Sequence, residues 1–171
     1  MTSRVNLSNQ ETIFEENLVV VDAMVIIKFH ALLVLDKLAT VWAREELAIT
    51  PQVEEEASFS KNGLIDLSSY IRNGFIRKQA LGDAEKELFL KYCREGIDKK
   101  LIHQGEASCL ALAISKNYGL ASDERIVREE FKRRCPGKIC VHSWDIVRMA
   151  RNLNLIQEKE ADDLILGLYH S

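Results

Sequence analysis

The sequence predicts an α/β protein in which helices cover both faces of a central, mostly parallel sheet, giving a three-layer α/β/α sandwich. The first observation behind this prediction is the alternation of short apolar runs with longer helical patterns along the chain. The second is that the run Val19-Val20-Val21 contains no polar position, as expected of a parallel strand buried on both faces. The third is that helical patterns follow these runs directly, which supplies the crossover connections that parallel strands need.

Five short segments are predicted to be strands, because they are mostly apolar or β-branched and end at turn or capping residues. They are residues 18–21, 47–49, 75–78, 120–123 and 138–141. The segments between them carry apolar residues at helical spacing. Helices are therefore expected over 25–47 (one or two helices), 52–58, 64–72, 83–95, 105–114, 124–134, 144–152 and 158–168.

Local signals mark several of these boundaries. Thr50 can cap the helix over 52–58 with its side chain, and Pro51 suits the first turn of that helix. Asn73-Gly74 ends the helix before the third strand, and Pro136-Gly137 turns the chain before the fifth. Strands and helices thus follow one another in the order that a parallel sheet requires.

The length of 171 residues and the formal net charge of −3 fit one domain over 1–171, with its core over about 17–168 and an N-terminal extension over 1–16. The charge argues against a protein that wraps nucleic acid with a generally basic surface, although it permits a local basic patch. The apolar stretches are too short to span a bilayer, and the N-terminus lacks a secretory pattern. We therefore expect a cytoplasmic protein with reduced, chiefly buried cysteines.

Acidic residues stand at several strand ends or helix starts: Asp22, Glu54 to Glu56, Glu106 and Asp123. In open parallel sheets the carboxyl ends of the strands face a common crevice, so these side chains converge if their strands are neighbours. Converging carboxylates raise one another's pKa and weaken the fold unless a cation neutralises them. Because the donors are oxygens, the expected cation is Mg²⁺ or Mn²⁺, and the chemistry it implies is phosphodiester hydrolysis by an activated water.

Four motifs carry these acids in order: Val-Val-Val-Asp22-Ala-x-Val-Ile-Ile, Thr50-Pro-Gln-Val-Glu-Glu-Glu56-Ala, Gly105-Glu106-Ala-Ser-Cys-Leu-Ala-Leu-Ala113 and Leu120-Ala-Ser-Asp123. In this order and spacing the chain resembles the PIN-domain nucleases from about residue 17 to 168. The resemblance implies a metal-dependent endoribonuclease acting on RNA, in many family members the toxin of a toxin–antitoxin pair. It also implies a small antitoxin protein as a partner and, with the apolar segment 31–41, a homodimer.

The resemblance assigns the catalytic, metal-binding acids to Asp22, Glu56, Glu106 and Asp123, which would hold Mg²⁺ or Mn²⁺. Each assignment has a structural alternative, because an acid near the start of a helix can cap it or interact favourably with its dipole. The two glutamates that precede Glu56 also remain open as the second acid.

Two positions depart from the family pattern. Met24 replaces the small polar residue that often lies two positions after the first acid, which weakens hydrogen bonding around the site. His103 replaces the aspartate that frequently lies three positions before the third acid, and it is either a phosphate or metal contact or an ordinary surface residue. These departures leave open a catalytically weak or inactive PIN-fold module that binds nucleic acid or a protein partner.

Basic residues near the first and fourth acids are candidate phosphate contacts. They are Lys28, Arg125, Arg128, Lys132, Arg133 and Arg134. The glutamates among them make a solvated amphipathic helix at least as good an explanation. Trp42 and Trp144 are candidates for stacking on bases, but the more frequent role of such residues is in the core.

Two other phosphate-handling classes are excluded by the residues around the first acid. A haloacid-dehalogenase-like phosphatase needs an aspartate where this chain has Met24. A response-regulator receiver needs an acidic pair where this chain has Val21-Asp22.

Overall fold

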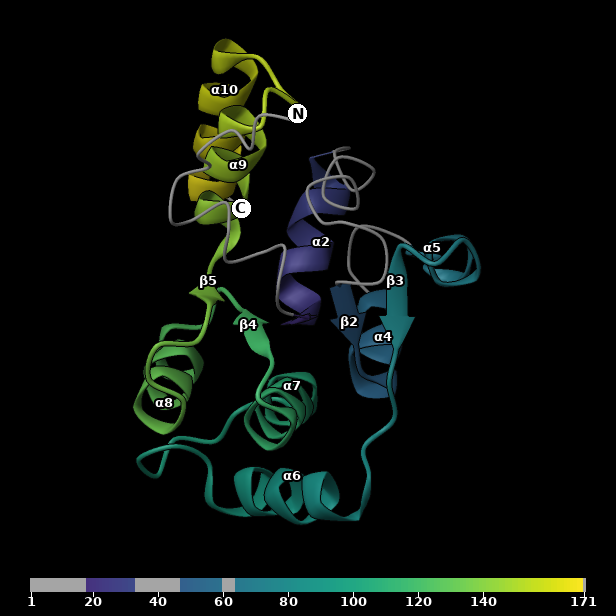
Figure 1. Ribbon diagram of the computed structural model, residues 1–171, viewed down its shortest axis with the longest axis vertical. Coiled ribbons are helices and arrows are strands. Elements are labelled where there is room, and N and C mark those ends of the chain that lie inside the picture. The colour runs from purple at the N-terminus through teal and green to yellow at the C-terminus, as the bar shows by residue number, and fades with distance from the viewer. Residues whose placement is uncertain (1–17, 33–46, 60–63, 171) are drawn as a thin grey trace, which may run out of the picture.

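The computed structural model describes residues 18–32, 47–59 and 64–170 of the chain. Its centre is a sheet of five strands in the order β3-β2-β1-β4-β5, and every neighbouring pair runs parallel. Helices flank this sheet (Figure 1). The predicted α/β class with a central parallel sheet is therefore confirmed.

The strands are short and most of the helices that connect them are longer, as the sequence predicts. The strands are β1 (Val19–Val21), β2 (Leu47–Ile49), β3 (Ile76–Lys78), β4 (Gly119–Ala121) and β5 (Cys140–Val141). The helices are α2 (Ala23–Ala31), α4 (Pro51–Ser58), α5 (Ser68–Arg72), α6 (Asp83–Glu95), α7 (Gln104–Lys116), α8 (Arg125–Arg134), α9 (Ser143–Asn152) and α10 (Glu158–His170).

Strand β1 lies at the centre of the sheet, where it pairs with β2 on one side and with β4 on the other. Val19, Val20 and Val21 are fully buried, which explains why this strand contains no polar residue. The chain builds outward from β1 to β2 and β3, and then returns to the other side of β1 for β4 and β5. This reversal makes the crevice beyond the carboxyl ends of β1 and β4 the expected place for a site.

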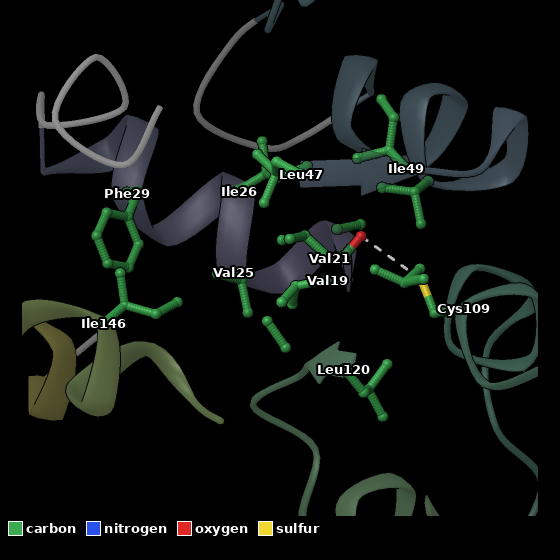
Figure 2. Close-up of a cluster of buried hydrophobic side chains, with 14 of the residues drawn as sticks. Val19, Val21, Val25, Ile26, Phe29, Leu47, Ile49, Cys109, Leu120 and Ile146 are labelled. Carbon is green, nitrogen blue, oxygen red and sulfur yellow. Dashed lines mark hydrogen bonds between the residues drawn. The ribbon is translucent and has the colours of Figure 1, made fainter. Parts of the chain in front are cut away.

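The apolar core packs helices against the central strands. Figure 2 shows Phe29 of α2 beside Ile146 of α9, and these two helices contact each other. Cys109 of α7 lies next to β1, where its thiol donates to the Val21 carbonyl oxygen at 3.5 Å (Figure 2). Burial raises the pKa of this thiol well above its usual value, so Cys109 belongs to the core and is not a reactive cysteine.

The helix predicted over 64–72 is wrong in its first half, because α5 begins only at Ser68. The Ser68 main-chain nitrogen donates to Asp66 Oδ1 at 2.9 Å, a local bond that competes with the first helical turn. Ile65 and Leu67 are buried without belonging to a helix. At these positions the spacing of apolar residues correctly indicated burial, but it wrongly indicated a helix.

The strands predicted over 120–123 and 138–141 are shorter than expected. Strand β4 ends at Ala121, so Ser122 and Asp123 lie beyond the sheet, and β5 begins only at Cys140. The helical prediction over 25–47 is confirmed for α2, whereas its continuation over 33–46 falls outside the described residues, as does the expected N-terminal extension.

The structure also bears on the expectations about membrane-spanning helices and about the cysteines. No helix within the described ranges is long and apolar enough to cross a membrane. The four cysteines are free thiols, of which one is buried and three are partly buried.

Candidate active site

Asp22 follows β1 directly and is fixed by three hydrogen bonds. Its main-chain nitrogen donates to the Ala121 carbonyl of β4 at 2.9 Å, which joins the two strand ends. Its Oδ1 accepts from the Ala23 nitrogen at 2.7 Å and so caps α2, and its Oδ2 accepts from the Ser122 hydroxyl at 3.1 Å. The side chain is thus a helix cap and also a carboxylate held at the switch point of the sheet.

The charge on Asp22 is electrostatically unfavourable. Burial raises the pKa of its carboxyl to about 7, and the negative charges of Glu106 and Glu56 add to the effect. The hydrogen bonds from Ser122 and Ala23 oppose the shift without cancelling it. Glu56 of α4 and Glu106 of α7 are therefore close enough to Asp22 for their charges to act on its carboxyl.

Glu106 lies in the first turn of α7 and is buried, with 6% of its surface exposed. Its Oε2 accepts a hydrogen bond from the His103 main-chain nitrogen at 2.9 Å, which closes the start of the helix. Burial raises the pKa of this carboxyl, the His103 contact lowers it, and the charges of Glu124 and Glu56 raise it further. As with Asp22, capping and membership of the acidic group coincide in one residue.

Glu56 is brought to this group by the way α4 packs on α7. Thr50 caps α4 through the Val53 nitrogen, and its hydroxyl lies 2.6 Å from the Ser108 hydroxyl of α7. Where the two helices meet, a Cβ on Gly105 would overlap Glu56 Oε2, so the glycine makes room for the carboxylate.

The other two glutamates of α4 are placed differently. Glu54 forms an ion pair with Lys78 of β3 at 2.9 Å, and Glu55 is exposed. Of these three acids, Glu56 is the one whose charge raises the pKa of both Asp22 and Glu106.

Among the described residues, Asp123, unlike the other three acids, is paired with a cation. Its Oδ1 accepts from the Ser143 main-chain nitrogen and its Oδ2 from the Ser143 hydroxyl, each at 2.8 Å, and Lys28 Nζ lies 2.9 Å from Oδ2. Burial alone would raise the pKa of Asp123, but these contacts outweigh it and the pKa is lowered. The alternative that Asp123 caps α8 is wrong, because its side chain bonds to the start of α9.

The donor atoms of the three grouped acids suit a divalent cation, whereas the arrangement of their side chains does not. Among the ion pairs between described residues, none involves Asp22, Glu56 or Glu106. The donors are all carboxylate oxygens, which suits a hard cation. Yet within the described ranges no three His, Cys, Asp or Glu side chains are arranged to hold a metal ion. Binding would therefore require these side chains to move together.

A cavity of about 330 Å³ opens beside Glu56 and Gly105. Its remaining walls are Gln52, Glu55, Phe59, His103 and Gln104. The Gln52 side-chain oxygen is buried there and accepts no hydrogen bond from the residues that the structure describes. From the sequence, His103 was a candidate phosphate or metal contact or an ordinary surface residue. Gln52 was missed, because a glutamine in the first turn of a helix does not by itself indicate a site.

Ser143 was also missed as a site residue. It stands two positions after β5, as Asp123 stands two positions after β4. Since β4 and β5 are neighbouring parallel strands, this equivalence of position was the signal that could have found the contact.

Asp22, Glu56 and Asp123 lie beyond the carboxyl ends of adjacent parallel strands. This arrangement is typical of nuclease-like α/β proteins. The chain belongs to the PIN domain family, whose model matches residues 18–135, and the resemblance seen in the motifs is thereby confirmed. No curated protein sequence matches the chain. PIN domains are generally nucleases that hydrolyse phosphodiester bonds, and they typically use divalent metals. The match ends before β5, so α9 and α10, which contact each other, lie outside it.

Proposed function

We propose that the protein is a Mg²⁺- or Mn²⁺-dependent endoribonuclease whose central acids are Asp22, Glu56 and Glu106. The observation that carries the proposal is the buried Asp22 carboxylate, whose pKa is raised to about 7 by burial and by the other two acids. Within the described residues no ion pair compensates this group. Near the switch point of the sheet, three carboxylates without a cationic partner among the described residues repel one another, and a divalent cation bound between them would remove this repulsion.

The bound cation would polarise a phosphoryl oxygen and lower the pKa of an attacking water. Ser122 holds Asp22 Oδ2 in one orientation, and Gly105 leaves space for Glu56 to approach. Asp123 was assigned as a fourth metal ligand from the sequence. We propose that its first task is to hold Lys28 at the edge of the site, where the ammonium group can meet a substrate phosphate.

The biological setting is proposed from the family resemblance. On that basis the protein is the toxin of a toxin–antitoxin pair, works in the cytoplasm on RNA, binds a small antitoxin protein and forms a homodimer. We also propose that the chain forms one domain over 1–171, with its core over about 17–168.

Cleavage of several single-stranded and structured RNAs, with Mn²⁺, with Mg²⁺ and with EDTA, tests the activity. Asp22→Asn should lower the metal-dependent rate more than about 100-fold, because even indirect partners of a metal ligand typically cost 10- to 100-fold. Glu54→Gln is the matched control, since Glu54 pairs with Lys78 away from the three acids. Metal-dependent cleavage that is equally fast in Asp22→Asn would not depend on this acid and would contradict the proposal.

A non-catalytic PIN-fold module is the second candidate. It is favoured by the absence of a preformed metal group among the described residues and by Met24, which is 40% exposed beside Asp22. Titration with Mn²⁺ separates the two functions. A nuclease should bind Mn²⁺ and lose that binding on Asp22→Asn, whereas a binding module should bind RNA equally well in both forms without cleaving it.

A further inference from the structure

A second cavity, of about 340 Å³, lies beside Asp123 and is assigned to no function by the family match. Its polar and aromatic walls are Lys28, Asp123, Arg128, His142, Trp144 and Tyr169. The first three belong to the part of the chain that the PIN model covers, and the last three to the segment beyond it. The cavity therefore exists only because the helices α9 and α10 close it.

One wall of the cavity offers cationic donors. Lys28 Nζ pairs with Asp123, and the ammonium group has three N–H donors, so this contact leaves others for a ligand. Arg128 Nη1 donates to the Ser122 carbonyl at 2.8 Å, which fixes the side chain and uses one of its five donors. Both side chains are partly buried, where a charged hydrogen bond is stronger than on an open surface. Together they suit a phosphate group.

Aromatic side chains also line the cavity. Trp144 of α9 and Tyr169 of α10 lie with their ring centroids 6.2 Å apart at an interplanar angle of 39°. Trp144 is partly buried, and Tyr169 is 69% exposed. An exposed tyrosine next to a half-buried tryptophan is a platform on which a flat base can stack, and base–aromatic stacking tolerates any base.

His142 supplies a third ring to the cavity wall. Its Nδ1 is buried and lies 3.5 Å from the Asp145 carboxylate, and its ring stands edge-on to Trp144 with the centroids 5.8 Å apart. These contacts hold His142 and Trp144 in a fixed relation at the start of α9.

We propose that this cavity binds one nucleotide, with its phosphate at Lys28 and Arg128 and its base against Trp144 and Tyr169. The volume falls within the few hundred cubic ångströms typical of small-ligand sites. The cavity combines cations, which suit a phosphate, with aromatic rings, which suit a base, and a nucleotide carries both groups. The further step, that the bound nucleotide is part of the RNA being cleaved, rests on the proposed nuclease function, whereas the binding itself does not.

Binding of AMP to the full-length, ¹⁵N-labelled protein in EDTA tests the proposal independently of any cleavage. The Trp144 indole N–H signal, distinguished from that of Trp42 with a Trp42→Phe variant, should shift as millimolar AMP is added. Adenosine and inorganic phosphate should each bind more weakly than AMP, because each fills only one end of the cavity. A protein that fails to cleave RNA but binds AMP in this way would contradict the nuclease proposal alone.

Two variants with matched controls locate the binding. Arg128→Gln should weaken AMP binding about ten-fold or more, and Tyr169→Ala about five-fold or more. Arg125→Gln on the same helix as Arg128, and Leu166→Ala on the same helix as Tyr169, should leave it unchanged, since neither residue lines the cavity. Circular dichroism and the urea unfolding midpoint check that each variant is folded.

Three results would overturn the proposal: no shift of the Trp144 signal with AMP, equal binding of inorganic phosphate and AMP, or equal losses in the cavity variants and their controls. An RNA pentamer that binds without moving the Trp144 signal would place the RNA elsewhere and would likewise contradict the use of this cavity by the substrate.

Discussion

Two aspartates beyond neighbouring strand ends have opposite electrostatic environments. Burial and like charges raise the pKa of Asp22 to about 7, whereas Ser143 and Lys28 outweigh burial at Asp123 and lower its pKa. An acid with a raised pKa holds its proton more tightly in the folded state than in the unfolded state, and an acid with a lowered pKa does the reverse. The two residues should therefore contribute to stability with opposite dependence on pH.

For Asp22, the free energy of unfolding of the metal-free protein should fall as pH rises between about 4 and about 7. In this window the unfolded carboxyl has lost its proton while the folded one retains it, so raising the pH favours unfolding. Asp22→Asn removes the titration, and it keeps an acceptor for the Ala23 nitrogen. At pH 8 in EDTA the variant should be more stable than the wild type, by up to about 4 kcal/mol for a pKa raised from 3.8 to about 7.

Urea unfolding in EDTA at pH 5 and pH 8 measures this effect. The gap between variant and wild type should widen from pH 5 to pH 8, and addition of Mn²⁺ at pH 8 should stabilise the wild type more than the variant. A gap that does not change with pH would contradict the electrostatic account of Asp22.

For Asp123, the stability contribution is present above the ordinary aspartate pKa and is lost as pH falls through its lowered value in the folded state. Asp123→Asn should destabilise the protein by about 2 kcal/mol at pH 7, because the partly buried Lys28 loses its counter-ion. The difference from wild type should shrink on acidification. Glu129→Gln, which removes the partner of the exposed Arg125, is the control and should change stability by less than about 0.5 kcal/mol.

At the scale of elements, helix starts build the site. Asp22 caps α2, Thr50 caps α4, Glu106 closes the start of α7, and Asp123 bonds to the start of α9. A helix start offers unpaired N–H groups and a partial positive charge, so it holds a carboxylate in place and lowers the cost of its charge. Capping and membership of the acidic group were alternatives in the sequence, and Asp22 and Glu106 each combine a helix-start contact with a pKa that burial and nearby acids raise.

Gly105 lies in the first turn of α7, where this helix faces Glu56 of α4. A Cβ at this position would overlap Glu56 Oε2, so Gly105→Ala should displace the Glu56 carboxylate. We expect Mn²⁺ affinity and metal-dependent cleavage to fall about ten-fold or more, with little loss of stability because alanine favours a helix over glycine. Isothermal titration with Mn²⁺ and urea unfolding measure the two quantities.

Ser115→Ala, an exposed change on α7, is the control for this variant. Unchanged Mn²⁺ affinity in Gly105→Ala would show that Glu56 does not need the space that the glycine leaves.

Much of the fold was predictable because burial on both faces leaves a clear pattern. Val19–Val21 and Leu47–Ile49 are apolar runs that end at a cap, and both were predicted as strands with correct or nearly correct bounds. The helix over 64–72 was not, because a local bond between Asp66 and Ser68 competes with helix in a way that apolar spacing does not report.

The candidate site was predictable to a similar degree. The proximity of Asp22 and Glu56 was to be expected if β1 and β2 were neighbouring parallel strands, as they are. Glu106 follows no strand, and it reaches the same region because α7 packs on α4. The engagement of Asp123 by Ser143 and Lys28 did not follow, since it depends on the strand order β1-β4-β5, and the sequence specifies strands more clearly than their order.

For the whole molecule, the C-terminal segment beyond the family match completes both the fold and the cavity next to Asp123. Strand β5 covers the edge of β4, and α9 buries Ile146, which lies beside Phe29 of α2 (Figure 2). The same segment supplies Ser143 to Asp123. A chain reduced to the matched residues therefore lacks one edge of the sheet and part of the core.

A chain that ends after Gly137 loses β5, α9 and α10, and it should show no cooperative unfolding transition. The lost burial of side chains such as Ile146 and Ala150 and the exposed edge of β4 together cost several kcal/mol, which is comparable to the whole stability of a typical domain. A chain that ends after Gln157 keeps β5 and α9 and should unfold cooperatively at a lower urea concentration than the full chain. It should also lose AMP binding, since Tyr169 is absent. Circular dichroism during urea titration compares the three chains, and equal unfolding midpoints would show that the C-terminal segment is not part of the fold's core.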